Sequence, residues 1–262
     1  MVQHCKRGHT MKIGIITGAS SGIGREFVYA VDKNFELDEI WVIARRKDRL
    51  EELKETCETP IRPLALDLTD SKSFETYQAL LEKEKPEVQV LINGAGFGVF
   101  GSFLDIPMSD HLNTIDLNTK ALTAISYLSI PYMPEGSHLI NIASNSSWQP
   151  VPYINVYGSS KAYVLNFSRA LSVELKAKKI HVMAVAPGWI KTEFFDHAVK
   201  DDTIKYYDRF YTAKQVVDKA MKDLRKRKMV SILGFPVRIQ VRMVKLLPVK
   251  WIMGIWCKQQ GK

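Results

Sequence analysis

Short runs of β-branched and other apolar residues alternate along the chain with longer segments whose apolar positions have helical spacing. This pattern predicts a parallel sheet with helices on both faces, because each return to a parallel strand needs a crossover. The predicted strands are 12–17, 39–44, 61–66, 88–93, 138–143, 180–186 and 229–234. The predicted helices lie near 23–32, 48–57, 71–84, 109–130, 156–177 and 213–226. Right-handed crossovers would build one doubly wound α/β domain of the Rossmann type, with about seven strands.

Two segments interrupt the alternation. Residues 189–212 hold six aromatic residues after Trp189 without a clean period, which favours a mobile substrate lid over a core element. Residues 236–259 are apolar and basic together and are interrupted by Pro248. Residues 1–10 have the composition of a flexible tail, so the predicted domain is 11–262.

The net charge of +9 is concentrated near the C-terminus. Residues 222–262 hold eleven Lys and Arg residues and one acidic residue, whereas residues 1–221 sum to −1. No motif for reading nucleic acid accompanies this charge, so a nucleic-acid partner is not expected. Three interpretations of the basic segment stay open: a cover for a substrate pocket or subunit interface, which we favour, a membrane-surface helix, or a field that attracts an anionic substrate tail.

Cysteine usage and hydropathy indicate a compartment. Cys5, Cys57 and Cys257 are far apart and odd in number, which argues against a disulfide framework or a zinc site. His4 and His9 flank Cys5 in the tail, but a flexible segment lacks the preformed geometry of a metal site, so no metal is expected. The chain shows no apolar run of signal-peptide or membrane-spanning length. We therefore expect a cytoplasmic protein.

A glycine-rich turn follows the first predicted strand. Gly18, Gly22 and Gly24 have the spacing G-x-x-x-G-x-G and lead into the helix near 23–32. Glycines let a pyrophosphate approach the backbone, and the helix N-terminus offers free N–H groups and partial positive charge. Because the spacing departs from G-x-G-x-x-G, a purely structural tight turn remains an alternative.

Further short motifs follow in order along the chain. They are Asn93-Gly94-Ala95-Gly96, Ser144, Tyr157-x-x-x-Lys161 and Pro187-Gly188. With the sequence TGASSGIG of the glycine turn, over about residues 11–195, they resemble the motifs of the classical short-chain dehydrogenase/reductase (SDR) family. The resemblance implies a hydride transfer between a nicotinamide cofactor and a carbonyl or secondary alcohol.

The resemblance also implies which residues bind the cofactor. They are Gly18, Ser20, Ser21, Gly22, Ile23, Gly24, Arg45, Arg46, Asp67, Leu68, Asn93, Ala95, Gly96, Tyr157, Lys161, Pro187, Gly188, Ile190 and Thr192. Asp67 matches the aspartate that hydrogen-bonds the adenine amino group. Capping of the helix near 71–84 is its alternative role, although Asp70 and Ser71 are better placed for that.

The end of the second predicted strand bears on the choice between NAD and NADP. An acid there hydrogen-bonds the ribose 2′-hydroxyl, whereas an arginine accommodates a 2′-phosphate. Ala44 stands at the acidic position and is followed by Arg45 and Arg46. We expect NADP(H) to be favoured over NAD(H), with Arg45 as the main phosphate contact. A solvated basic helix start is the alternative, although cations are unfavourable at a helix N-terminus.

Tyr157 and Lys161 lie one turn apart on one face of the predicted helix 156–177. A nearby ammonium favours the phenolate and lowers the pKa of a tyrosine from about 10, which suits acid/base catalysis near neutral pH. By the resemblance, Tyr157 exchanges a proton with the substrate oxygen, and Lys161 also holds the nicotinamide ribose.

Two further catalytic residues come from the resemblance. Ser144 would hydrogen-bond the carbonyl and steady the developing alkoxide. Ser146 and Ser147 compete with it, but the thirteen-residue spacing to Tyr157 and the position at a strand end select Ser144. Asn118 would complete a proton relay, and hydrogen bonding to helix backbone is its compatible alternative.

The expected substrate wall is aromatic. Its residues are Phe97, Trp148, Tyr153, Trp189, Phe194 and Phe195, with Pro150, Val151, Tyr206, Tyr207, Phe210 and Tyr211 as further candidates. Such a wall favours a flat or long apolar substrate, for example a hydroxysteroid, a bile acid or a lipid-like ketone. Packing of the lid onto the body is the alternative role of each aromatic residue.

Three functions stay open. The leading one is an NADP(H)-dependent oxidoreductase acting on an apolar carbonyl or alcohol. The others are a 3-oxoacyl or membrane-peripheral lipid reductase and a non-catalytic dinucleotide-binding regulator. The complete set Asn118, Ser144, Tyr157 and Lys161 argues against the regulator. The resemblance also implies a homodimer or homotetramer formed through the helices near 109–130 and 156–177.

Overall fold

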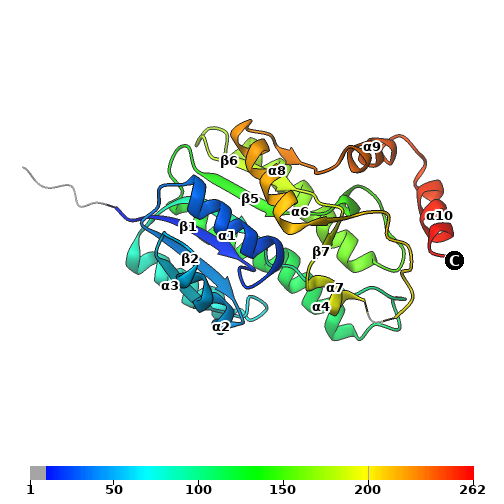
Figure 1. Cartoon of the computed structure of the whole chain (residues 1–262), viewed down its shortest axis with the longest axis horizontal. Coiled ribbons are helices and arrows are strands. Elements are labelled where there is room, and N and C mark those ends of the chain that lie inside the picture. The colour runs from blue at the N-terminus through cyan, green and yellow to red at the C-terminus, as the bar shows by residue number, and fades with distance from the viewer. Residues whose placement is uncertain (1–9, 200) are drawn as a thin grey trace, which may run out of the picture.

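The computed structural model describes residues 10–199 and 201–262. Its main sheet has seven parallel strands in the order β3-β2-β1-β4-β5-β6-β9 (Figure 1). The strands are β1 (Lys12–Thr17), β2 (Glu39–Ala44), β3 (Ile61–Ala65), β4 (Glu87–Asn93), β5 (His138–Ile142), β6 (His181–Val185) and β9 (Val230–Ser231). The predicted single α/β domain of the Rossmann type is confirmed. The seventh predicted strand, 229–234, is much shorter than expected.

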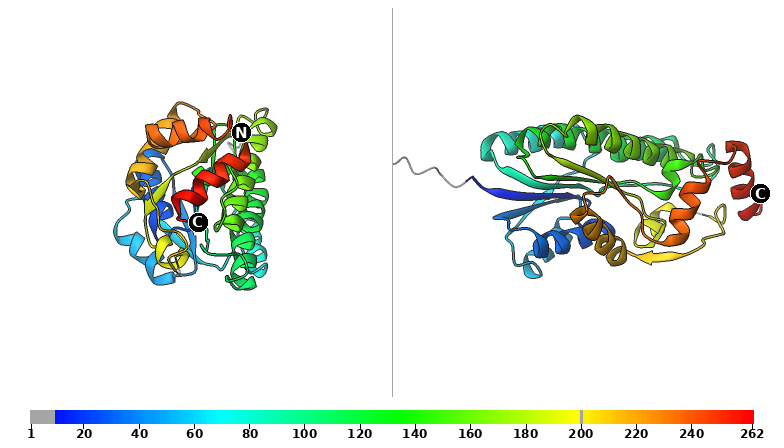
Figure 2. Two further views of the ribbon diagram at one scale, coloured as in Figure 1. Left: turned by 90° about the vertical axis from the view of Figure 1, so that its right-hand side faces the viewer. Right: turned by 90° about the horizontal axis from the view of Figure 1, so that it is seen from above.

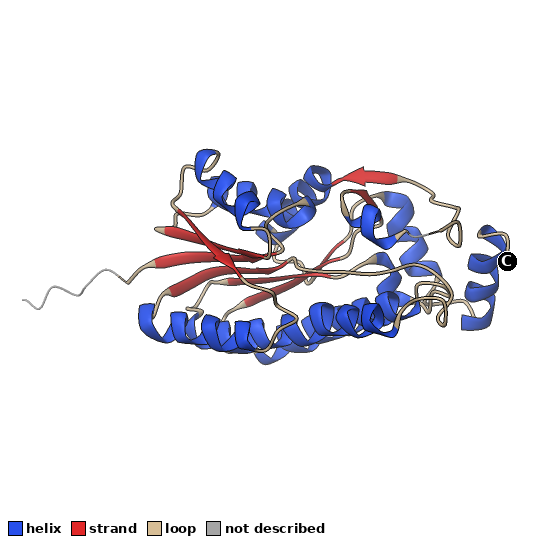
Figure 3. Cartoon of the chain, turned by 90° about the horizontal axis from the view of Figure 1, so that it is seen from below, coloured by secondary structure: helices blue, strands red, loops and turns tan. Residues whose placement is uncertain are grey.

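Helices cover both faces of this sheet (Figure 3). On one side lie α1 (Gly22–Asn34) and α8 (Ala213–Arg225), and on the other α3 (Lys72–Glu84), α5 (Leu122–Ser129) and α6 (Asn155–Glu174). The helix predicted near 109–130 is α4 (Met108–Ile115), a π-helical turn (Asp116–Ala121) and α5. The helix predicted near 48–57 is the short α2 (Lys47–Glu51) followed by a 3-10 turn (Glu52–Glu55).

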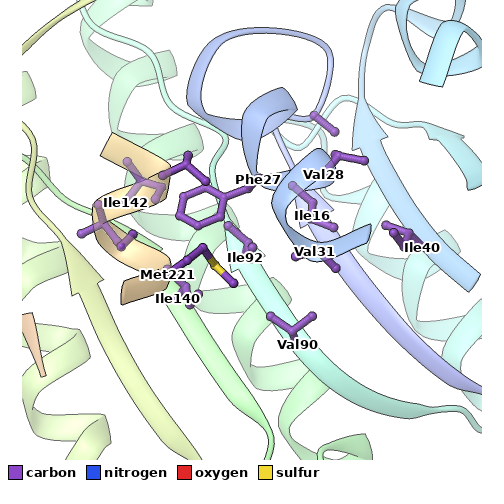
Figure 4. Packing of buried hydrophobic residues seen from close by; sticks show 14 of the residues in the cluster. Ile16, Phe27, Val28, Val31, Ile40, Val90, Ile92, Ile140, Ile142 and Met221 are labelled. Atoms are coloured by element: carbon purple, nitrogen blue, oxygen red, sulfur yellow. The ribbon is translucent and has the colours of Figure 1, made fainter. Parts of the chain in front are cut away.

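The core consists of two apolar layers, one on each side of the sheet. Successive strand residues point to opposite faces, so Ile15 packs in the layer beneath α3 and α5 while Ile16 packs in the layer beneath α1 and α8. Figure 4 shows the second layer, where Phe27 of α1 and Met221 of α8 meet the sheet. Burial on both faces explains why the strands are continuous apolar runs.

The strand order fixes where a ligand can enter. The chain moves from β1 to β2 and β3 on one side and then crosses to β4 on the other side of β1. At this reversal the crossover helices diverge and leave a crevice at the carboxyl ends of β1 and β4. The glycine turn and the Asn93-Gly94-Ala95-Gly96 motif begin at these two strand ends.

The last part of the chain adds short elements beyond the sheet. They are β7 (Trp189–Lys191), α7 (Phe194–Ala198), β8 (Phe210–Thr212), α9 (Phe235–Met243) and α10 (Val249–Gln259). Strands β7 and β8 pair in parallel with each other. Helices α9 and α10 lie at the end of the molecule opposite the start of β1 (Figure 1, Figure 2). In the described part of the chain, no helix combines the length and apolar character needed to cross a bilayer.

The segment 189–212 contains more regular structure than a loop. Ile190, Ala198 and Ile204 are buried, and the segment contributes both strands of the β7–β8 pair. Other contacts of the segment reach distant parts of the chain: Val199 bridges to Phe100, and Lys205 N donates to Gln260. Its own sequence therefore shows no helical or strand period. Motion of this segment as a lid stays a prediction. Of the predicted flexible tail, only Thr10 belongs to the described residues, and the His4, Cys5 and His9 group lies outside them.

Candidate active site

A cavity of about 1030 Å³ runs along the carboxyl edge of the sheet. Most predicted site residues line it, namely Gly18, Ser20, Ser21, Gly22, Ile23, Gly24, Arg45, Arg46, Asp67, Leu68, Ala95, Gly96, Phe97, Ser144, Tyr157, Lys161, Pro187, Gly188, Trp189, Ile190, Thr192, Phe194 and Phe195. Four predicted site residues lie outside this lining, namely Asn93, Asn118, Trp148 and Tyr153, and so do four of the further wall candidates, Pro150, Tyr207, Phe210 and Tyr211. The volume is sufficient for an extended ligand of dinucleotide size together with a substrate.

The glycine turn is built for close approach of backbone to backbone. A Cβ atom on Gly24 would lie 2.2 Å from Gly18 O, so any side chain there would force the turn apart. Thr17 Oγ1 accepts hydrogen bonds of 3.1 Å from the backbone N–H groups of both Gly94 and Ala95, which fixes two motifs against each other. Ser21 is the N-cap residue of α1, but its side chain makes no capping hydrogen bond within the described residues. The first turn of α1 also carries no acidic residue. The turn fits an anionic phosphate group.

Arg46 bridges the outer end of the cavity. Its guanidinium donates to Glu193 at 2.8 Å and to Ser20 Oγ at 3.1 Å. The hydrogen bond from Arg46 lowers the pKa of Glu193, against a small opposing effect of burial. Arg45 lines the same cavity, is exposed, and makes no ion pair with any residue in 10–199 or 201–262. A free guanidinium at the end of β2 fits a 2′-phosphate better than a ribose hydroxyl.

Asp67 sits at the adenine end of the predicted cofactor site. Its carboxylate accepts from Thr69 N at 3.0 Å and from Thr69 Oγ1 at 2.8 Å. Burial raises the pKa of Asp67, but these bonds and the charge of Arg45 outweigh it, and the pKa lies below its ordinary value. The carboxylate is therefore an ionised acceptor on the cavity wall.

On α6, Lys161 is buried and Tyr157 is half-buried, and both face the cavity. The Lys161 Nζ lies 5.7 Å from the centre of the Tyr157 ring and donates to Ile142 O at 2.8 Å. Burial raises the pKa of Tyr157 to about 12, opposed by a hydrogen bond with Ser144, and burial lowers the pKa of Lys161 to about 8. The expected lowering of the tyrosine pKa is therefore not found in the protein alone, because removal from water outweighs the effect of the neighbours.

Three serines after β5 have separate positions. Ser144 faces Tyr157, donates to Asn145 Oδ1 at 3.3 Å and accepts from Ser146 N at 3.2 Å. Ser147 Oγ donates to the backbone carbonyl of Lys161 at 2.8 Å and so ties β5 to α6. Ser146 lines the cavity with a buried hydroxyl that has no partner among the described residues. Ser144 is the serine next to the tyrosine, as the spacing predicted.

The two predicted asparagines are held in buried networks. Asn118 Oδ1 accepts from Phe97 N at 2.8 Å, and its Nδ2 donates to Phe97 O at 2.8 Å and to Ser160 Oγ at 2.9 Å. It thus fixes the loop after β4 against α6. Asn93 donates to Asn141 at 2.8 Å and to Ser126 at 3.0 Å, inside the sheet. Gly94, rather than Asn93, lines the cavity.

The aromatic wall differs in part from the prediction. Phe100, which is absent from the predicted set, makes edge-to-face contacts with two rings of the wall. The distance between ring centres is 6.2 Å to Tyr157 and 6.0 Å to Trp189. Trp148 instead packs beneath Arg169, whose Cζ lies 5.6 Å from the ring centre, and Tyr153 lies beneath Lys262, whose Nζ is 5.5 Å from the ring centre. Both are turned to partners that only the fold brings near.

Other functional positions carried signals too weak to single out. A Cβ atom on Gly98 would lie 2.6 Å from Tyr157 Cδ2, so this glycine leaves room for the tyrosine ring. Glu193 follows the recognised Thr192 directly, but its partner Arg46 is 147 residues away. Leu247, Ile252 and Trp256 of the C-terminal segment also line the cavity. This agrees with the favoured interpretation of the segment as a cover for a substrate pocket, although the sequence singled out none of the three residues.

Comparison with known proteins identifies the family. The family described as short chain dehydrogenase matches residues 12–203. The chain is similar to sulfoacetaldehyde reductase 2 of Chromohalobacter salexigens, with 33% identity over 191 residues, 70% of this chain and 74% of the relative. It is similar to the NADP-dependent 3-hydroxy acid dehydrogenase of Schizosaccharomyces pombe, with 32% identity over 187 residues, 69% of this chain and 72% of the relative.

A solved structure agrees over nearly the whole chain. The short-chain dehydrogenase from Sphingobium yanoikuyae in complex with NADPH superposes with a TM-score of 0.76 at 26% identity, covering 93% of this chain and 96% of that one. The family match includes every motif from the glycine turn to Thr192. The chain belongs to the classical short-chain dehydrogenase/reductase family.

Proposed function

We propose that this protein is an NADPH-dependent reductase of an apolar ketone or aldehyde, working reversibly as an alcohol dehydrogenase. The observation that carries the proposal is the joint placement of Ser144, Tyr157 and Lys161 on one wall of a cavity whose other end is a glycine turn. A bound nicotinamide would supply the hydride, and the chain's own residues supply position and protons.

The proton chemistry follows from the burial of these side chains. With its pKa raised to about 12, the Tyr157 hydroxyl stays protonated at neutral pH and is a hydrogen-bond donor to a carbonyl oxygen. Ser144 offers a second hydroxyl to the same oxygen, which stabilises negative charge as it develops. The Lys161 ammonium beneath the ring favours the tyrosinate that remains after proton donation.

The NADP preference rests on the end of β2. Arg45 is an exposed cation that lines the cavity, and Ala44 stands where an acid would otherwise accept from a ribose hydroxyl. Two comparisons point the same way, one with a relative named NADP-dependent and one with a structure in complex with NADPH. The unpaired guanidinium is the stronger argument, because it concerns this chain's own residues.

The apolar substrate class rests on the wall beyond Tyr157. Phe100, Val151, Trp189, Phe194 and Phe195 line this end of the cavity. Apart from Lys161, no Lys or Arg of the described residues accompanies them there. Hydroxysteroids, bile acids and lipid-like ketones, including 3-oxoacyl groups, match such a wall. Short anionic aldehydes are the competing class, because one relative is named a sulfoacetaldehyde reductase.

The test is NADPH oxidation by the purified protein with three groups of carbonyl compounds: steroid ketones, 3-oxoacyl thioesters and sulfoacetaldehyde. We expect turnover with the first or second group and little with the third. Turnover of sulfoacetaldehyde alone would overturn the substrate class. Tight dinucleotide binding without turnover of any carbonyl would support the non-catalytic regulator instead.

The remaining predictions about the assembly stay proposals. Exposed apolar residues on α4, α5 and α6, among them Leu112, Tyr127 and Tyr163, are consistent with a homodimer or homotetramer formed through these helices. Mass measurement in solution by light scattering decides the oligomeric state. The cytoplasmic location is likewise a prediction.

A further inference from the structure

Helix α9 and the turn after it present four different sides. Going round the helix, these are a buried side (Val237, Val241), a basic side (Arg238, Arg242, Lys245), an exposed apolar side (Phe235, Ile239, Met243, Leu246) and a side that lines the cavity (Pro236, Gln240, Val244, Leu247). Met243 lies at the border of the last two sides, because it is exposed and also lines the cavity. The order follows from about 100° of rotation per residue. The exposed apolar side therefore lies between the basic side and the cavity.

Helix α10 repeats this arrangement. The cavity is lined by Ile252, Ile255, Trp256 and Gln259. Ile255 is also exposed and forms the neighbouring apolar side with Trp251, and Lys258 and Lys250 follow on the far side. Both helices lie at the end of the molecule away from the sheet (Figure 2). A continuous band of exposed apolar residues thus borders the cavity, with basic residues behind it.

The band is unusual for a surface exposed to water. Leu246 is 80% exposed and Trp251 is 66% exposed. Residues 224–262 contain ten Lys and Arg residues and no acid. Isolated exposed apolar residues are normal, but a band of six with a basic border marks a surface that another phase or partner covers.

We propose that α9 and α10 dock this protein onto an anionic phospholipid membrane, with the cavity beside the lipid surface. Charge complementarity argues for this occupant: basic side chains would meet lipid headgroups while Leu246, Trp251 and Ile255 enter the boundary of the acyl chains. The arrangement goes beyond the proposed reaction, because it gives an apolar substrate a path from the bilayer into the cavity without passing through water.

The experiment measures sedimentation of the full-length protein with vesicles of phosphatidylglycerol and phosphatidylcholine, without cofactor. We expect binding at low salt that weakens as salt screens the charges. In Arg242→Gln/Lys250→Gln we expect binding about thirtyfold weaker, since each basic residue near an anionic surface contributes a factor of about five. Lys222→Gln/Lys226→Gln, which removes the same charge near the opposite edge of the sheet, should bind as the wild type does.

A second pair of variants tests the apolar band. Leu246→Ser/Trp251→Ser should lose most vesicle binding, while Val173→Ser, which alters an equally exposed residue (67%) on α6, should keep it. None of these side chains lines the cavity, so NADPH oxidation with a water-soluble ketone should be unchanged and reports separately on the proposed reaction. Absence of binding to anionic vesicles at low salt would overturn the proposal. So would Leu246→Ser/Trp251→Ser if it dissociated an oligomer and left vesicle binding intact, because the band would then be a subunit interface.

Discussion

The two edges of the parallel sheet both bury titratable side chains, but the surroundings differ. At the amino edge, the Nδ1 atoms of His138 and His181 lie 3.4 Å apart, His181 Nε2 lies 3.1 Å from Lys228 O, and Phe35 covers His138. At the carboxyl edge, Lys161 is buried and Tyr157 is half-buried, and both face an open cavity. Burial lowers the pKa of His138 to about 4 and that of Lys161 to about 8, by the same physical cause. A shifted pKa therefore does not mark an active site unless space for a ligand lies beside it.

The largest change in activity is expected at Tyr157, the titratable side chain that faces the cavity at the carboxyl edge. Tyr157→Phe removes the hydroxyl that faces the cavity and should reduce turnover by a factor of about 10² to 10⁴, because a positioned general acid contributes on that scale. NADPH binding should persist. Tyr163→Phe is the matched control, since this tyrosine lies on the same helix with its hydroxyl bonded to Thr123. Steady-state kinetics with full activity in Tyr157→Phe would reject the mechanism.

Gly98→Ala tests how closely the carboxyl edge holds the tyrosine ring. The added Cβ would lie 2.6 Å from Tyr157 Cδ2, so the ring must shift. We expect kcat to fall about tenfold to a hundredfold, since a displacement near 1 Å has effects of that size, with little change in NADPH affinity. Gly158→Ala is the control, because the nearest atom that its Cβ would meet outside its own helix is Val151 Cγ2, at 3.7 Å. An equal loss of kcat in both variants would contradict a specific role for Gly98.

Arg45→Ala tests the cation at the end of β2. Loss of a charge-assisted contact with a 2′-phosphate should weaken NADPH binding about tenfold to a hundredfold and leave NADH binding unchanged. Titration calorimetry with both cofactors measures the difference. Arg49→Ala removes a similarly exposed guanidinium that interacts with Glu52 instead. If Arg45→Ala weakened the binding of both cofactors equally, the preference for NADPH would depend on other residues.

His138→Gln tests the amino edge. Because the pKa of His138 is about 4 in the folded chain and near 6.5 when unfolded, the unfolded chain binds more protons between these values. Stability should therefore fall as pH decreases from about 6.5 to 4, by roughly 1–2 kcal/mol from this residue after allowance for its partial exposure. Urea unfolding at pH 7 and pH 4.5 should show a smaller acid loss in His138→Gln, whereas His111→Gln, at the surface, should behave as wild type. NADPH binding should be unaffected by His138→Gln. A clear loss of NADPH binding would contradict the conclusion that the ligand site lies only at the carboxyl edge.

The smallest effect is expected at the mouth of the cavity. Glu193 holds Arg46 at 2.8 Å beside the glycine turn, so its carboxylate competes with cofactor phosphates. Glu193→Gln should tighten NADPH binding by about twofold to fivefold, the scale of an exposed ion pair. The same assay on Glu52→Gln, an exposed partner of Arg25, should show no gain. Weaker binding in Glu193→Gln would mean that the carboxylate supports the cofactor.

The sequence predicted the first six strands within two residues of their observed bounds, because strands buried on both faces are continuous apolar runs. It also predicted Gly24 and Ser144 at the cavity, since they follow strands whose carboxyl ends meet at one edge, and Tyr157 and Lys161 through their helical spacing together with the family resemblance. The NADP preference and the substrate class remain proposals. The order of the motifs along the chain is sufficient to place Gly24 and Ser144 at the cavity, because each motif is positioned by the strand that precedes it.

Tertiary structure alone decided the rest. Phe100 and Trp256 line the cavity, while Trp148 packs beneath Arg169 and Asn118 holds the Phe97 loop. The apolar residues of α9 and α10 divide between the cavity and the exposed band, a division that a single helical period cannot show. The physical reason is that the role of each of these side chains depends on partners far away in sequence, which only the folded chain brings together.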